Sequence, residues 1–173
     1  YIVDDGSTDG TGDIIEDLNA TYGNVKLIQR GSKLGFGSAV RDGIKEALRD
    51  LKNGRVLQMD ADLSHDPKYL PSMFSTEADI VVGSRYVQGG GTKGWPLTRR
   101  IASRTACWLA SVFLGLPAKD STSGFKTYSK SAAQIVAEES KENRSMGAFE
   151  IETIYLAKKH GLTVKELPIT FIN

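Results

Sequence analysis

The sequence predicts an α/β fold with a largely parallel sheet, and two patterns support this prediction. Short apolar runs alternate along the chain with longer segments whose apolar residues recur every three or four positions. Such alternation is typical of strands joined by crossover helices. In addition, four predicted strands run into polar or glycine-rich segments, at residues 4–5, 31–37, 60–62 and 84–85. Ligands of such sheets bind at the carboxyl ends of the strands, so these segments predict the position of a site.

The first half of the chain is predicted to contain three strands and three helices. Thr11 or Asp13 can cap the first helix, and Pro67 suits the first turn of the third. In chain order the elements are a strand at 1–3, a helix at 11–21, a strand at 25–29, a helix at 38–51, a strand at 55–59 and a helix at 67–74.

The second half is predicted to add three strands and three helices. Residues 89–94 are rich in glycine and are expected to form a flexible loop, and Pro96 opens the helix that follows. In chain order the elements are a strand at 79–82, a helix at 96–116, a short strand at 127–128, helices at 131–140 and 149–160, and a closing strand at 163–172.

The composition restricts the class of protein. A chain of 173 residues with 40% hydrophobic residues has the size of one domain, so we take residues 1–173 as a single domain. Its 22 basic residues nearly balance its 21 acidic residues, which argues against a strongly basic surface for nucleic acid. The single cysteine excludes an internal disulfide bond. Both ends read as strands already under way, so we expect the domain to be truncated at both ends.

The charge is unevenly distributed along the chain. Residues 80–119 contain six basic residues and no acidic one. This pattern suits an anionic ligand or an anionic membrane face. The longest apolar run, at 105–116, is well short of the ~20 residues that a membrane span needs.

Asp60 and Asp62 follow an apolar strand and flank Ala61. Two carboxylates two residues apart at a strand end can reach one divalent cation, and their hard oxygen atoms suit Mg²⁺ or Mn²⁺. The alternative is that the two acids cap the next turn. His65 follows them and is interpreted as a residue that is exposed or supports the site, rather than as a metal ligand.

Two further segments contain candidates for binding a nucleotide or a phosphate. Asp4 and Asp5 can accept hydrogen bonds from a nucleobase or ribose, although Asp and Gly also make turns. Gly35 and Gly37 precede a helix and can lie close to a phosphate, although they can equally serve helix packing. The glycine patterns of dehydrogenases and P-loop enzymes are absent from the sequence.

Trp95, Arg99 and Ser103 follow one another at intervals of four residues. They therefore share one face at the start of a helix, and an arginine and a hydroxyl on one face can clamp a phosphate. The alternative is an ordinary surface arginine. Cys107 lies in an apolar stretch of the same helix and is interpreted as a small core residue.

The motifs, in this order, resemble the family 2 glycosyltransferases and, among them, the dolichyl-phosphate (polyprenyl-phosphate) mannose synthases. The motifs DDGSTDGT and DAD are typical of the broad family. The combination of the remaining motifs points to the polyprenyl-phosphate branch. The matching segments are VDDGSTDGT (3–11), KLGFGSAV (33–40), MDADLSHDP (59–67), GSRYVQGG (83–90), GW (94–95) with Arg99 and Ser103, DSTSGFK (120–126) and ELPITF (166–171).

The resemblance implies a GT-A fold, a nucleotide-sugar donor, a divalent metal and inverting transfer. It assigns Asp62, Arg85 and Asp120 to catalysis. It assigns Asp60 and Asp62 to the metal, Mg²⁺ or Mn²⁺, and Arg99 and Ser103 to the acceptor phosphate. The donor-binding residues it implies are Asp4, Asp5, Lys33, Gly37, Asp60, Ala61, Asp62 and Arg85. Two of the family's segments, one before the first strand and one basic segment after the last, are missing here, and Ser64 stands where some members have a Gln ligand.

The expected reaction is transfer of a hexose, mannose from GDP-mannose, to a polyprenyl or dolichyl phosphate. One alternative is another family 2 transferase, for example from UDP-glucose or to a polysaccharide. Another is a non-catalytic module that binds a nucleotide. No nucleic-acid partner is expected.

The helix at 96–116 begins basic and ends apolar, so it can lie in a membrane interface. We expect a cytoplasmic protein held peripherally at the cytoplasmic face of a membrane. The alternative is that Trp108, Val112 and Phe113 are ordinary core residues of an amphipathic helix.

Overall fold

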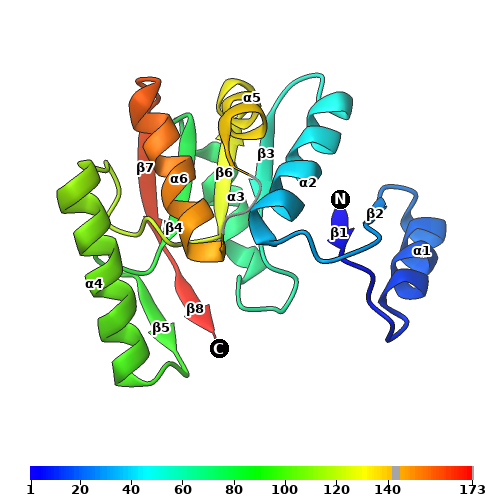
Figure 1. Cartoon of the computed structure of the whole chain (residues 1–173), viewed down its shortest axis with the longest axis horizontal. Coiled ribbons are helices and arrows are strands. Elements are labelled where there is room, and N and C mark those ends of the chain that lie inside the picture. Colours follow the sequence, from blue (N-terminus) through cyan, green and yellow to red (C-terminus); the bar gives the residue numbers. More distant parts are fainter. Residues whose placement is uncertain (142–144, 173) are drawn as a thin grey trace.

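The computed structural model describes residues 1–141 and 145–172, and it is a sheet flanked by helices (Figure 1). The helices are α1 (Thr11–Tyr22), α2 (Phe36–Asp50), α3 (Leu70–Ser75), α4 (Leu97–Leu114), α5 (Lys130–Glu139) and α6 (Met146–Lys159). The strands are β1 (Ile2–Asp4), β2 (Leu27–Gln29), β3 (Arg55–Gln58), β4 (Ile80–Ser84), β5 (Gly91–Lys93), β6 (Lys126–Ser129), β7 (Val164–Pro168) and β8 (Thr170–Ile172). The α/β class predicted from the sequence is confirmed.

The central sheet has the strand order β3-β6-β4-β7. β4 and β7 are parallel, whereas β6 runs antiparallel to both of its neighbours. Figure 1 shows α2, α5 and α6 on one face of this sheet and α3 on the other. The main core forms between the sheet and helices α2, α5 and α6. Ile80, Val82, Tyr128 and Phe149 are fully buried there.

The N-terminal strands form a separate ladder. β1 and β2 pair in parallel, with Val3 opposite Ile28. Among the described residues, neither strand pairs with the central sheet. α1 covers this ladder, and Ile15 is its one buried residue. The N-terminal unit is therefore joined to the rest of the molecule mainly through the packing of β1 against α2.

Two sequence predictions about the strands need correction. The prediction of a flexible loop at 89–94 is wrong, because Gly91–Lys93 form β5 and pair in parallel with β8. The single closing strand predicted at 163–172 is two strands, with the buried Ile169 between them. β7 extends the central sheet, and β8 leaves it to pair with β5. Figure 1 shows β5 beside α4, which it directly precedes in the chain, with β8 on the other side of β5.

Helix α4 lies at the edge of the molecule (Figure 1) and exposes much of its apolar surface. Trp108 is 62% exposed, Val112 58% and Phe113 80%, so the alternative that they are core residues is wrong. Cys107, on the inward side, is buried as predicted. Among the helices of the described residues, none is both long enough and apolar enough to cross a bilayer.

Candidate active site

A pocket of about 310 Å³ lies beyond the carboxyl ends of β3 and β4. The start of α4 forms one wall, and the loops after β3 and before β6 form the other. Its lining residues are Asp60, His65, Arg85, Trp95, Arg99, Ala102, Ser103, Thr122, Ser123, Gly124, Met146, Gly147 and Phe171. Two strand ends and one helix face that were singled out in the sequence therefore meet at this pocket.

Arg85 is a buried and firmly held cation of the pocket. It follows β4, is 6% exposed, and donates from Nε and Nη2 to the two carboxylate oxygens of Asp120, at 2.8 and 2.7 Å. Thr122 Oγ1 accepts a third bond from Nη2 at 2.9 Å. Burial alone would lower the pKa of Arg85, but the hydrogen bonds and charge of Asp120 outweigh it and raise the pKa. The guanidinium group is thus charged and fixed in orientation before any ligand binds.

Trp95 and Arg99 continue this wall from the start of α4. The Cζ atom of Arg99 lies 4.1 Å from the centroid of the Trp95 ring, and that of Arg85 lies 5.1 Å from it. Ser103, one turn after Arg99, accepts a 2.6 Å hydrogen bond from the hydroxyl of Tyr86. The face predicted from the spacing of Trp95, Arg99 and Ser103 therefore does line the pocket. Two arginines, a hydroxyl and an aromatic ring form a cationic wall that suits a phosphate.

Asp60 faces this wall from the end of β3. Its backbone N–H donates to Nδ1 of His65 at 3.0 Å, and Nε2 of His65 lies 3.8 Å from the carboxylate. His65 is 2% exposed and stacks on Phe125 at 4.7 Å, so it supports the turn after β3 rather than facing solvent. Burial raises the pKa of Asp60. A cation bound here would stabilise the ionised form of this carboxylate.

Asp62 differs from Asp60 because it is exposed and lies outside the pocket lining. Its Oδ1 atom accepts a 3.0 Å bond from the backbone N–H of Ser64, and hydrogen bonds from Ser64 lower its pKa. Leu63, between them, has a φ of 66°, a conformation uncommon for a non-glycine residue. Asp62 therefore remains ionised on a tight turn.

The donor chemistry of this acid pair fits a divalent cation. Among the described residues, no group of three or more His, Cys, Asp or Glu side chains gathers as a metal site. Asp60 and Asp62 alone would therefore hold the ion together with oxygen atoms of a bound substrate, which is how Mg²⁺ is usually held. Ser64 is buried, with 4% of its surface exposed, and it lies outside the pocket lining.

A buried polar network that no sequence pattern indicated lies next to the pocket. Lys126 and Glu150 form a fully buried ion pair, and Gln58 Nε2 donates to Glu150 Oε1 at 2.6 Å. Gly124 separates this network from the site, because a Cβ atom there would lie 3.5 Å from Asp60 Oδ1 and 3.6 Å from Glu150 Oε1. Burial lowers the pKa of Lys126 and raises that of Glu150. The network therefore lies next to Asp60, with Gly124 between them.

The N-terminal candidates for donor binding lie outside this pocket. Asp4 is 6% exposed and accepts bonds within its own loop from the backbone N–H groups of Gly6 and Ser7, at 3.2 and 3.0 Å. Asp5 pairs with Arg30, a buried residue that the sequence reading missed. Arg30 also donates to Ser38 Oγ at 2.6 Å and thereby ties the loop after β1 to the start of α2. Its position at the end of a predicted strand was the available signal.

The glycine-rich segment before α2 also lies outside the pocket lining. Lys33 is exposed, whereas Gly37 is buried in the first turn of the helix. Gly35 caps that helix with a φ of 96°, a conformation that favours glycine. The structure thus brings Asp60, Arg85, Arg99 and Ser103 together, with Asp120 behind Arg85. It leaves Asp4, Asp5, Lys33 and Gly37 outside the pocket, on the N-terminal unit and α2, and it leaves Ala61 and Asp62 on the exposed turn beside the pocket.

Comparisons with known proteins agree with this arrangement. The family model described as Glycosyl transferase family 2 matches residues 1–136. The chain is 35% identical, over 98% of its length, to the polyprenol monophosphomannose synthase of Mycolicibacterium smegmatis, and it spans 65% of that protein. It is 32% identical, over 99% of its length, to the undecaprenyl-phosphate mannosyltransferase of Micrococcus luteus, and it spans 71% of that protein.

A solved structure is similar to the fold as a whole. The crystal structure of glucosyl-3-phosphoglycerate synthase from Mycobacterium tuberculosis, in complex with phosphoglyceric acid, superposes with a TM-score of 0.59 at 16% identity. The match covers 99% of this chain and 59% of that one. Identity this low shows the fold alone, and it agrees with the GT-A architecture expected from the sequence.

Proposed function

Because the chain belongs to glycosyltransferase family 2, we propose that the protein transfers a hexose from a nucleotide sugar to a polyprenyl phosphate. We further propose mannose from GDP-mannose as the sugar and donor. The observation that carries the proposal is the pocket in which Arg85, Arg99 and Ser103 face Asp60. Such a pocket can hold an anionic acceptor beside a donor diphosphate. The names of the two relatives, both mannose transferases of polyprenyl phosphates, support the choice of sugar and acceptor.

The cationic wall is the acceptor side of this site. Arg85 is oriented by Asp120, so Asp120 acts through Arg85, and Arg99 and Ser103 extend the wall along α4. A phosphate monoester has a second pKa near 6 and is mostly dianionic at neutral pH. Its oxygen can attack the anomeric carbon without a strong general base. The wall therefore has to hold and orient the phosphate rather than deprotonate it.

The acid pair is the donor side. Asp60 and Asp62 would hold Mg²⁺ or Mn²⁺, which neutralises charge on the diphosphate leaving group when it is bound. Asp4, Asp5, Lys33, Gly37 and Ala61 are proposed to contact the nucleotide or its phosphates. Since the attack and departure occur on opposite faces of the anomeric carbon, the transfer inverts its configuration.

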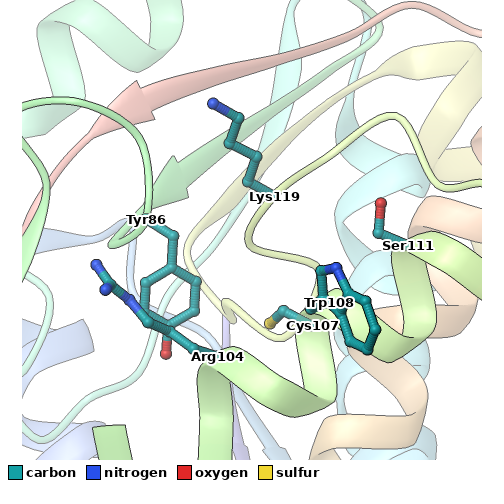
Figure 2. A pocket seen from close by; sticks show the side chains of 6 residues that line it. All are labelled: Tyr86, Arg104, Cys107, Trp108, Ser111 and Lys119. Atoms are coloured by element: carbon teal, nitrogen blue, oxygen red, sulfur yellow. The ribbon is translucent and has the colours of Figure 1, made fainter. Parts of the chain in front are cut away.

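We propose that the protein is held peripherally at the cytoplasmic face of a membrane, and helix α4 supports this location. Its exposed apolar residues include Leu97, Ile101, Val112 and Phe113. A second, open groove of about 380 Å³ lies beside it. Figure 2 shows Arg104 entering this groove from α4, next to Tyr86, and Lys119 on a different segment of the chain. The groove is lined by Tyr86, Arg104, Cys107, Trp108, Ser111 and Lys119. Basic and aromatic side chains beside an apolar stripe suit the interface of an anionic bilayer.

A donor screen tests the proposal. Purified protein is incubated with Mg²⁺ or Mn²⁺, polyprenyl phosphate and a panel of nucleotide sugars, and the lipid-linked product is counted. We expect transfer from GDP-mannose to exceed transfer from UDP-glucose. Transfer only from another donor would overturn the choice of mannose. Binding of nucleotide without transfer to polyprenyl phosphate from any donor would overturn the proposed reaction.

A further inference from the structure

Trp95 carries a buried hydrogen-bond donor that the described part of the protein leaves without an acceptor. Its Nε1 atom has essentially no exposed surface and no hydrogen-bond partner there. An indole N–H can only donate, and most buried donors in proteins are paired. The ring of Trp95 lines the proposed acceptor pocket. Because the residue lines the pocket, a ligand that displaces the atoms now covering Nε1 can supply the missing acceptor.

The surroundings of Trp95 define the charge of that ligand. The guanidinium groups of Arg85 and Arg99 both lie over its ring, at 5.1 and 4.1 Å from the centroid. An aromatic face attracts cations, so the ring allows two arginines to approach the same place. Two guanidinium groups therefore flank Trp95, and an oxyanion is the acceptor that they favour.

We propose that Trp95 Nε1–H donates a hydrogen bond to a phosphate oxygen of the prenyl phosphate acceptor. Trp95, Arg85 and Arg99 then form one subsite for a phosphate monoester dianion. The inference rests on the proposed function, and it adds a residue that selects for the acceptor. A monoester has three terminal oxygens. If one attacks the sugar, two remain, and the donors of this subsite can hold them.

The position of Trp95 favours the acceptor over the donor diphosphate. Trp95 directly precedes α4, and Arg99 and Ser103 follow it on the same face of that helix. The donor phosphates are expected on the opposite wall, at Asp60. The distinction is measurable, because a prenyl monophosphate and a nucleoside diphosphate can be added separately.

The first test is a substitution that keeps the aromatic face and removes the N–H group. In Trp95→Phe we expect the Kd for a soluble short-chain prenyl monophosphate to rise about tenfold, the effect of losing one hydrogen bond to a charged oxygen. The Kd for GDP should stay within twofold. Tyr22→Phe is the matched control, since Tyr22 is an exposed aromatic residue on α1 outside both pockets, and its Kd for the same ligand should not change. An unchanged Kd in Trp95→Phe overturns the inference.

The second test observes the proton itself and needs no activity. In Trp108→Phe, Trp95 is the remaining tryptophan, so the protein shows one indole N–H resonance. Saturation with prenyl monophosphate should move this resonance downfield and slow its exchange with water. Inorganic phosphate should do the same at higher concentration if the subsite reads the phosphate alone. No movement with prenyl monophosphate, or the same movement with GDP alone, overturns the inference.

Failure of this inference is separable from failure of the proposed function. If the unmodified protein transfers sugar to prenyl phosphate and Trp95→Phe has the same KM for the acceptor, the reaction stands and the role of Trp95 is wrong. If the unmodified protein transfers no sugar but its indole resonance responds to prenyl monophosphate, the subsite stands and the proposed reaction is wrong.

Discussion

The two walls of the pocket are built in different ways. On the cationic wall, Arg85 is 6% exposed and held by Asp120 and Thr122, so its orientation is fixed by the protein alone. On the acidic wall, burial raises the pKa of Asp60, and Asp62 stands on an exposed turn. The first wall is complete before a ligand arrives, whereas the second lacks a positive charge. The difference fits the proposed function, in which the acceptor side is preorganised and a cation and the donor would complete the donor side.

The largest expected effect is a loss of stability when the ion pair between Asp120 and Arg85 is broken. Asp120→Asn leaves the buried charge of Arg85 without its counter-charge, and we expect the free energy of unfolding to fall by about 3–5 kcal/mol. Denaturant titration measures this. Glu46→Gln, which breaks the exposed pair with Arg49, is the control and should cost less than about 1 kcal/mol. Equal stabilities of the two variants would contradict a preorganised wall.

The acidic wall should respond in rate rather than in stability. Asp62 is exposed, so Asp62→Asn should unfold at nearly the same denaturant concentration as the unmodified protein. The rate of transfer should fall on the order of 10²-fold, because one charged metal ligand is lost. Asp66→Asn, which alters the nearby cap of the turn at Lys68, serves as the control. Near-normal turnover with an unchanged metal titration would remove Asp62 from the site.

Arg99 tests whether the two walls bind different substrates. Arg99→Ala removes one cation of the acceptor wall and should raise the KM for polyprenyl phosphate about tenfold, the effect of losing a charge-assisted hydrogen bond. The Kd for GDP should stay within twofold. Arg100→Ala, on the same helix but outside the pocket lining, is the matched control. A loss of GDP affinity in Arg99→Ala would mean that the walls are not separate.

The smallest expected effect concerns the outer face of α4. Phe113→Ser exposes less apolar surface at a position that is 80% exposed, so stability should hardly change. Binding to anionic vesicles at low salt should weaken a few-fold, and binding of the unmodified protein should weaken as salt rises, since exposed charges are screened. Vesicle binding that is absent at low salt would show that this face is not a membrane surface.

Local sequence patterns predicted the polar strand ends and the shared face of Trp95, Arg99 and Ser103, because each depends on residues close together in the chain. They did not predict that Arg85 pairs with Asp120, 35 residues later, since such a contact depends on how the strands assemble. For the same reason the antiparallel β6 in the centre of the sheet was not expected. Nor was β5, because Gly91–Lys93 carry a glycine-rich pattern and become a strand through pairing with β8. The exposure of Phe113 likewise follows from the position of α4 at the edge of the molecule.

The most direct test of the proposed reaction is a transfer assay with both substrates and a controlled supply of metal. The protein is incubated with GDP-mannose and polyprenyl phosphate, with Mg²⁺ or Mn²⁺ or with a chelator, and the product is analysed for its linkage and anomeric configuration. We expect polyprenyl phosphomannose in which the anomeric configuration of the donor is inverted, formed with metal and lost with chelator. A product of retained configuration, or equal yields with metal and chelator, would contradict the proposed reaction.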